Sequence, residues 1–195
     1  EGLVHYRQAY DTLDALAREV PGNAEVQRAR VYSRASVGQL LVLLRRPAEA
    51  LRELEPELAQ LDAWRRADAA DAIAPLALGA VLNLVGEARL QRGEYEAALA
   101  RFDEAARYLG PELADGVADF RVLRAQMLAG RAQALANLAR ATRGPERAAR
   151  LAEARAAARS AIPLLEGLLD DGDYSLEAKR LLADVRPVLD GPAQG

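Results

Sequence analysis

The sequence predicts an all-α protein in which about eight helices form one continuous array. Apolar residues recur at intervals of three and four, as in Leu51, Leu54, Leu58 and Leu61, which places them on one face of a helix. No segment shows the strict alternation of a half-buried strand. Alanine supplies much of the apolar 51% of the chain, and alanine has the highest intrinsic helix propensity.

Glycine and proline mark the boundaries between the expected helices. These helices span roughly residues 3–20, 24–45, 47–62, 67–91, 94–109, 112–142, 145–169 and 174–189. Pro47 and Pro145 stand where a first helical position is expected, which suits a residue without an amide proton. Asp173 precedes the final helix. Pro75 and Pro163 fall inside helical patterns, so each is expected to kink or restart its helix.

Composition and charge exclude several classes of protein. A chain of 195 residues suits one domain or one array. The absence of cysteine excludes disulfides and thiolate metal sites. The 26 basic and 29 acidic residues leave a net charge of -3, which gives no electrostatic case for a nucleic-acid partner, since such proteins usually carry a basic surface. The longest apolar run, residues 40–44, is far shorter than a bilayer span, so no membrane insertion is expected.

The sequence contains an internal repeat. Shifting residues 31–64 by 48 positions onto residues 79–112 pairs small and apolar residues of the same kind. The pairs are Val37-Gly38 with Val85-Gly86, Ala50-Leu51 with Ala98-Leu99, Leu54 with Phe102, and Leu61 with Leu109. Two helix hairpins therefore share one pattern, and Gly130 continues the series of small residues on a third.

The pattern resembles the tetratricopeptide repeat (TPR). The best copy has Gly86, Gly93, Tyr95, Ala98, Phe102 and Ala105, followed by Pro111. The resemblance implies a right-handed α–α superhelix of antiparallel hairpins, in which small residues allow close approach and Tyr95 and Phe102 fill the spaces between hairpins. The recurrence exceeds the usual unit of about 34 residues. Such extended units are similar to helical-repeat regions beside kinase, regulator or other effector domains of large bacterial proteins. We expect a cytoplasmic location.

The array divides into units that match this pattern to different degrees. Residues 23–63 form a unit that keeps Gly38 and Ala50 but has Arg45 in place of the turn glycine, Pro47 in place of the aromatic and Glu57 in place of an alanine. The other expected parts are the best-matching unit 66–110, a unit 111–170, a capping helix 173–190 and a tail 191–195.

Residues 1–22 look like the second helix of an earlier unit. Tyr6, Ala9, Leu13 and Leu16 fall at its aromatic, small, large and packing positions. The first helix of that unit is missing from the sequence. We therefore expect residue 1 to be a processed terminus or a cut within a longer protein.

No motif supports an enzyme. His5 is the only histidine, so a zinc site of the HExxH kind or a catalytic Cys-His pair cannot form. The acidic "LDDGDY" turn lacks the ligand spacing of a calcium loop. No glycine-rich phosphate loop or GxSxG elbow is present. We expect no catalytic residue, no cofactor and no metal.

The resemblance also implies where a partner binds. In the TPR family the first helices of the units line a concave groove that holds extended peptides or partner helices. The corresponding positions here are Tyr32, Gln39, Asn83, Glu87, Gln91, Arg124, Met127 and Arg131. Tyr32 and Met127 are expected to be exposed there as adaptable contacts. The alternative interpretation is that these residues are ordinary solvent-facing helix positions.

The leading hypothesis is a non-catalytic scaffold that binds a protein or peptide, or another domain of its own chain, through its concave face. A regulatory domain that senses a small molecule or peptide within a larger bacterial signalling protein is the second hypothesis. A structural module that self-associates as a homodimer is the third. An enclosed polar pocket would favour sensing, an open groove would favour peptide binding, and a large two-fold contact would favour self-association.

Overall fold

The structure is a computed structural model that describes residues 2–68, 71, 73–109, 118–170, 172 and 174–190, without the side chains of residues 118 and 119. This part of the chain contains helices and no strand. The helices are α1 (Gly2–Glu19), α2 (Ala24–Leu43), α3 (Pro47–Ala67), α4 (Ile73–Gln91), α5 (Tyr95–Ala105), α6 (Ala118–Ala141), α7 (Gly144–Glu166) and α8 (Ser175–Asp190). The all-α prediction is confirmed.

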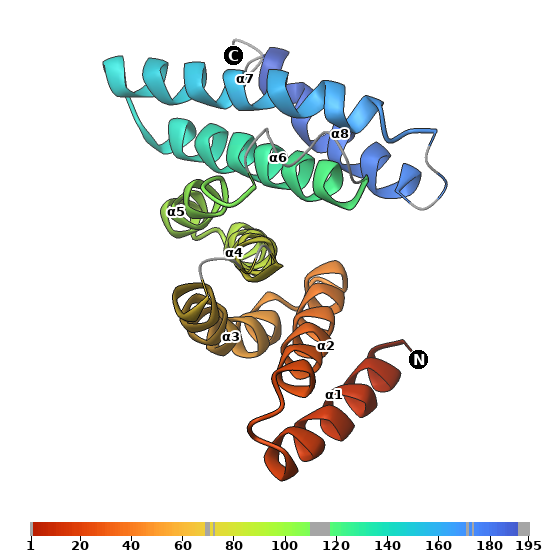
Figure 1. Ribbon diagram of the computed structural model, residues 1–195. Helices are drawn as coiled ribbons and strands as arrows, with labels where there is room; N and C mark the ends of the chain where they lie inside the picture. The colour runs from red at the N-terminus through yellow and green to blue at the C-terminus, as the bar shows by residue number, and fades with distance from the viewer. Residues whose placement is uncertain are drawn as a thin grey trace.

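The helices stack as an array in which each packs mainly against its neighbours in the chain. Figure 1 shows α3 and α5 on one side, with α2 and α4 beside them on the other. One buried cluster spans α2 to α5 and includes Met127 and Ala134 of α6, and a second joins α6, α7 and α8. The molecule is therefore a helical repeat array, and the right-handed sense of its superhelix remains a prediction.

Several helix boundaries differ from the sequence prediction, among them the end of α5, which lies at Ala105 instead of residue 109. Helix α3 continues through Pro56 to Ala67, five residues beyond the expected end at residue 62. Helix α4 begins at Ile73 instead of residue 67, because the Asp71 carboxylate accepts hydrogen bonds from the backbone N–H groups of Ile73 and Ala74 at 2.8 and 3.2 Å. This cap satisfies amides that have no partner within the helix. Helix α7 runs through Pro163 and ends at Glu166.

Some predictions fall outside the described residues. These concern Pro111, residues 112–117 of the sixth expected helix, Asp173 and the tail 191–195.

The two hairpins that share the 48-residue repeat pack through the same pair of positions. A Cβ atom added at Gly38 would lie 2.4 Å from Cδ2 of Leu54, and one added at Gly86 would lie 2.7 Å from Cε1 of Phe102. Both distances are shorter than a carbon contact allows, so each glycine lets the large side chain lie against the helix backbone. Ala50, Ala98 and Ala105, the other small motif positions, are likewise fully buried.

Glu57, which replaces the small residue of the first unit, is 1% exposed and lies in an ionic cluster. Its carboxylate accepts a hydrogen bond from Nη1 of Arg34 at 2.9 Å and lies 3.6 Å from Nη2 of Arg30. Arg34 also pairs with Glu53 at 3.1 Å, and its guanidinium lies 5.5 Å from the Tyr10 ring centre. The cluster thus joins α1, α2 and α3 by charge where the next unit uses Ala105.

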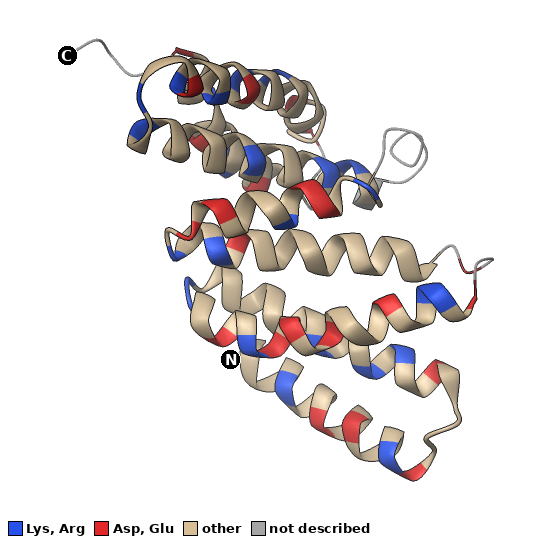
Figure 2. Cartoon of the chain, turned by 90° about the vertical axis from the view of Figure 1, so that its left-hand side faces the viewer, with Lys and Arg blue, Asp and Glu red and all other residues tan. Residues whose placement is uncertain are grey.

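Helix α4 is the most apolar helix of the array. Figure 2 shows its charged residues only near its C-terminal end, where Glu87 and Arg89 lie. Among the described residues it alone is long and apolar enough to cross a membrane by length and composition. Half of its most apolar stretch is buried inside the protein, as expected for a helix of the core.

Candidate functional site

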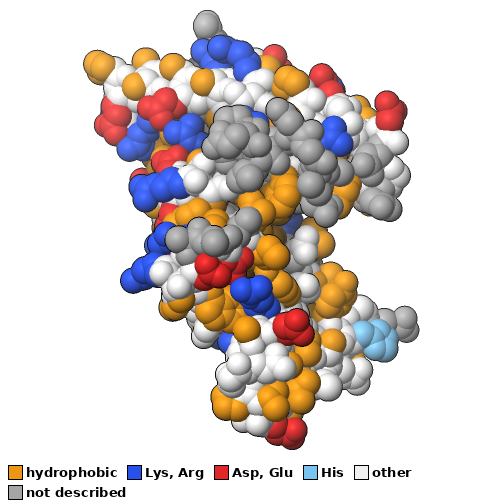
Figure 3. Space-filling model, in the orientation of Figure 1, with side chains coloured by type: hydrophobic (Ala, Val, Ile, Leu, Met, Phe, Trp, Pro, Cys, Tyr) orange, Lys and Arg blue, Asp and Glu red, His pale blue; other side chains and the backbone are white. Residues whose placement is uncertain are grey.

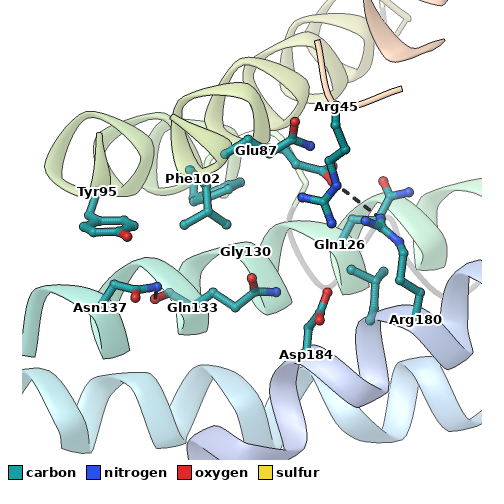
Figure 4. A pocket seen from close by; sticks show the side chains of 13 residues that line it. Arg45, Glu87, Tyr95, Phe102, Gln126, Gly130, Gln133, Asn137, Arg180 and Asp184 are labelled. Carbon is teal, nitrogen blue, oxygen red and sulfur yellow. Dashed lines mark hydrogen bonds and ion pairs between the residues drawn. The ribbon is translucent and has the colours of Figure 1, made fainter. Parts of the chain in front are cut away.

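A cavity of about 190 Å³ lies where α4, α6 and α8 meet beside the turn that carries Arg45. Figure 4 shows side chains from all these elements around it. The lining residues are Arg45, Glu87, Leu90, Gln91, Tyr95, Phe102, Gln126, Gly130, Gln133, Asn137, Arg180, Leu181 and Asp184. The cavity is open to solvent on one side and is lined by a mixture of charged, amide and apolar groups.

Helix α6 supplies one wall of the cavity through four residues on a single stripe. Gln126, Gly130, Gln133 and Asn137 follow one another at intervals of four, three and four, which aligns them along one helix face. Gly130 is required within this stripe, since an added Cβ atom would lie 2.4 Å from Cζ of Phe102. Phe102 therefore lies between Gly86 and Gly130 and forms the apolar part of the lining.

Gln91, at the end of α4, presents an unused acceptor. Its Nε2 atom donates a hydrogen bond to the carbonyl oxygen of Val42 at 3.0 Å, which fixes the orientation of the amide. Its Oε1 atom is buried and accepts no hydrogen bond in the structure. A buried acceptor without a donor costs free energy, and a bound N–H donor would remove that cost.

A polar network links the three helices behind and beside the cavity. The side chain of buried Asn83 donates to Oε1 of Gln126 at 3.4 Å, and Nε2 of Gln126 donates to Glu177 at 2.8 Å. Arg180 lies 3.5 Å from both Glu177 and Glu87. The network holds Gln126 in place and ties α8 to α4.

The charges that line the cavity are mixed. Arg45 and Arg180 are cationic, and Asp184 and Glu87 are the acidic residues. Burial raises the pKa of Glu87, while the charge of Arg180 acts in the opposite direction. No single sign of charge dominates, so the site suits a polar ligand better than a polyanion.

A second cavity of about 310 Å³ lies next to the first and shares Gln133, Asn137 and Asp184 with it. Its remaining lining comes from Ala136, Ala139, Arg140, Arg147, Leu151, Pro187 and Val188 of α6, α7 and α8. Arg147 makes no ion pair or hydrogen bond with any described residue. The two cavities are therefore adjacent along the Gln133 face of α6.

The structure brings only part of the predicted groove together. Glu87 and Gln91 line the first cavity, and their role as partner contacts stays a prediction. Tyr32, which is 38% exposed, and Gln39, which is also exposed, lie on α2 and line neither cavity. Tyr95, expected to fill the space between hairpins, is half-buried and lines the cavity.

The structure contradicts the predicted groove exposure of two further residues, Asn83 of α4 and Met127 of α6. Asn83 and Met127 are 1% and 3% exposed, so neither faces an open groove. Asn83 is buried in the polar network, and Met127 packs in the apolar cluster of the earlier hairpins. Arg131 pairs with Asp103 of α5 at 2.6 Å and Glu153 of α7 at 3.6 Å, outside the cavity. Arg124 lines neither cavity.

Sequence reasoning missed Gln126, Gln133 and Asn137, together with the charged residues Arg45, Arg180 and Asp184. The amide residues do leave a signal, because they share a helical stripe with Gly130. Arg180 and Asp184 leave none, because only the tertiary packing of α8 brings them to this face.

Among the described residues, no group of three or more His, Cys, Asp or Glu side chains could hold a metal ion. Comparison with protein-family models, with curated proteins and with solved structures finds no match.

Proposed function

We propose that the chain is a non-catalytic interaction scaffold that binds an extended segment of a partner protein along α4 and α6, with the first cavity as the anchor point. The observation that carries the proposal is the convergence of four side-chain amides on one open cavity. They are Gln91, Gln126, Gln133 and Asn137.

Amide side chains suit a peptide backbone because each carries both a donor and an acceptor. An extended peptide presents N–H and C=O groups that both require partners when it leaves water. The side chain of Gln133 makes no hydrogen bond within the described structure, so its donor and acceptor are available to a ligand. The unpartnered Oε1 atom of Gln91 is buried, so a ligand reaches it only when the side chains that cover it move.

The size of the cavity also favours a segment of chain. Small-molecule sites usually enclose about 300–1,000 Å³, whereas this cavity holds about 190 Å³ and is open on one side. It can accept one or two side chains of a peptide whose backbone continues along the face. The mixed charges of Arg45, Arg180 and Asp184 suit a peptide with polar residues of both kinds.

We assign the array to the TPR type. The equivalent contacts of Gly38 with Leu54 and of Gly86 with Phe102 support this assignment, because they place the small residue of one helix against the large residue of the next. The burial of Ala98 and Ala105 supports it as well. The origin in a large bacterial protein and the cytoplasmic location are further parts of this proposal.

Selection of peptides tests the proposed site. A phage library of unstructured 12-residue peptides is selected on the immobilised protein, and an enriched peptide is synthesised with a fluorophore for polarisation measurements. We expect Gln133→Leu to raise the Kd of this peptide about tenfold, since one or two hydrogen bonds to the ligand are lost.

The matched control is Gln39→Leu, which removes an exposed amide from α2 outside both cavities. This variant should bind the peptide as the unmodified protein does. Failure to enrich any peptide, or equal binding by the Gln133→Leu variant, would contradict the proposal.

The second cavity favours one alternative, a regulatory domain that senses a small anionic molecule. Its volume of about 310 Å³ reaches the range of small-ligand sites. Arg140 and Arg147 could hold a carboxylate, while Leu151, Pro187 and Val188 provide apolar contact. A thermal-shift panel of organic monocarboxylates tests this alternative. A shift that disappears in Arg147→Gln would favour it, and an absence of any shift would exclude these ligands.

A further inference from the structure

Helix α1 carries an apolar stripe on the side that faces away from the array. Tyr6, Ala9, Leu13, Leu16 and Val20 follow at intervals of three and four along and just beyond this helix. Tyr6, Leu16 and Val20 are 49%, 40% and 38% exposed. Figure 3 shows hydrophobic side chains at the surface of the lower end of the molecule, where α1 lies in Figure 1. A continuous stripe of this kind indicates a missing contact.

The repeat identifies what covers the same stripe elsewhere. A shift of 48 residues places Tyr6 at the position of Leu54, and a further shift of 48 places it at Phe102. Leu54 and Phe102 are both fully buried. Each lies against a glycine of the preceding helix, Gly38 on α2 and Gly86 on α4.

The other side of α1 is already occupied. Leu3 and Tyr10 of this helix pack against the cluster formed by α2 to α5, and Arg7 lies 3.4 Å from Glu49 of α3. The equivalent positions of α3, Leu51 and Leu58, belong to the same cluster. Helix α1 therefore has the contact that a second helix makes with the next unit, and it lacks the contact with a first helix of its own unit.

We propose that the outer face of α1 binds one further helix of the same repeat array, the first helix of α1's own unit, which carries Gly where it crosses Tyr6. A side chain at that point would collide with the tyrosine ring, as a Cβ atom at Gly86 would collide with Phe102. The remaining stripe then packs against apolar residues of the added helix. This inference rests on the repeat and does not depend on the proposed peptide site.

A grafted chain tests the inference. Residues 73–96, which contain α4 and the following turn, are duplicated directly before Glu1, so that the copy of Gly86 stands 16 residues before Tyr6, as Gly86 stands before Phe102. We expect the melting temperature to rise by about 4 °C or more. The backbone amides of α1 should exchange with solvent at least about tenfold more slowly, since the added helix suppresses local opening.

The matched control is the same graft with Gly86→Leu in the duplicated segment, which should lose both effects. Tyr6→Ala should lower the melting temperature of the grafted chain and leave that of the unmodified chain almost unchanged. Unchanged amide exchange in α1, or a lower melting temperature of the graft, would overturn the inference. An unmodified chain that is a dimer in light scattering and becomes a monomer with Tyr6→Glu would also overturn it, by assigning the face to a second copy.

Discussion

Arg45 and Gly93 occupy the same left-handed turn in two units, with φ angles of 57° and 76°. Arg45 donates its backbone N–H to Val42 and Arg46 donates to Leu41, at 3.0 and 2.9 Å. Gly93 and Glu94 repeat both bonds to Leu90 and Arg89, at 3.0 Å each. Arg45 is the only described residue other than glycine with a positive φ, so the turn geometry is retained although the residue that favours it is absent.

This equivalence predicts opposite effects of two substitutions. Left-handed backbone costs a residue with a side chain about 1–2 kcal/mol. Arg45→Gly should therefore stabilise the protein by about 1 kcal/mol, and Gly93→Ala should destabilise it by a similar amount. Urea denaturation measures both free energies of unfolding. Destabilisation by Arg45→Gly would show that the Arg45 side chain contributes more than the turn strain costs.

Phe102 is predicted to be sensitive to any side chain on either flanking glycine. Gly130→Ala should destabilise the protein by about 1–3 kcal/mol, because the new methyl group collides with the ring. Adding Phe102→Leu should recover part of this loss, which a double-mutant cycle measures. The control is Gly22→Ala, whose Cβ would meet no atom within 4 Å. Equal losses of stability from Gly130→Ala and Gly22→Ala would contradict the close contact of Gly130 with Phe102.

The buried ionic cluster at Glu57 predicts a large effect of a small chemical change. Glu57→Gln removes the charge that faces Arg30 and Arg34, and should cost about 2–4 kcal/mol in a denaturation experiment. Glu53→Gln is the control, because Glu53 pairs with the same Arg34 but is more exposed. That change should cost under about 1 kcal/mol. Equal losses in the free energy of unfolding from Glu57→Gln and Glu53→Gln would show that the burial of Glu57 does not affect stability.

Glu87 predicts a pH dependence of stability. Burial raises its pKa in the folded protein, so the folded state binds the proton more tightly than the unfolded chain does. The tighter proton binding by Glu87 stabilises the folded state fully below the pKa of this group in the unfolded chain, about 4.3. This stabilisation is lost as the pH rises through the pKa of Glu87 in the folded protein. Glu87→Gln should therefore leave the melting temperature almost unchanged at pH 4 and raise it at pH 7. A difference in melting temperature between the variant and the unmodified protein that shrinks from pH 4 to pH 7 would contradict the prediction.

The helices were predictable because their signals are local. Periodicity and Gly or Pro marks predict α2 and α7 within a few residues of their observed ends. The start of α4 was not predictable from periodicity, since the Asp71 cap and Pro75 override an apolar pattern that continues toward residue 67. The continuation of α3 through Pro56 depends on packing, which local sequence does not report.

The candidate site was predictable only in the unit that matches the repeat best. Glu87 and Gln91 were found because Gly86 and Phe102 define the register of α4. On α6 the predicted stripe through Met127 is one residue away from the observed stripe through Gln126, which corresponds to a rotation of about 100° about the helix axis. The alanine-rich α7 offers no distinctive partner that would define this register.

The contact of Arg180 with Glu87 joins residues 93 positions apart. In an ideal repeat array each unit contacts only its neighbours, so a terminal helix can fray without effect on the middle. Here α8, the last helix of the described residues, forms part of the cavity wall and is tied to α4. Transient detachment of α8 would therefore open the first cavity. If that cavity binds the proposed peptide, an occupied cavity would in turn hold α8 in place, and peptide affinity and detachment of α8 would be thermodynamically linked.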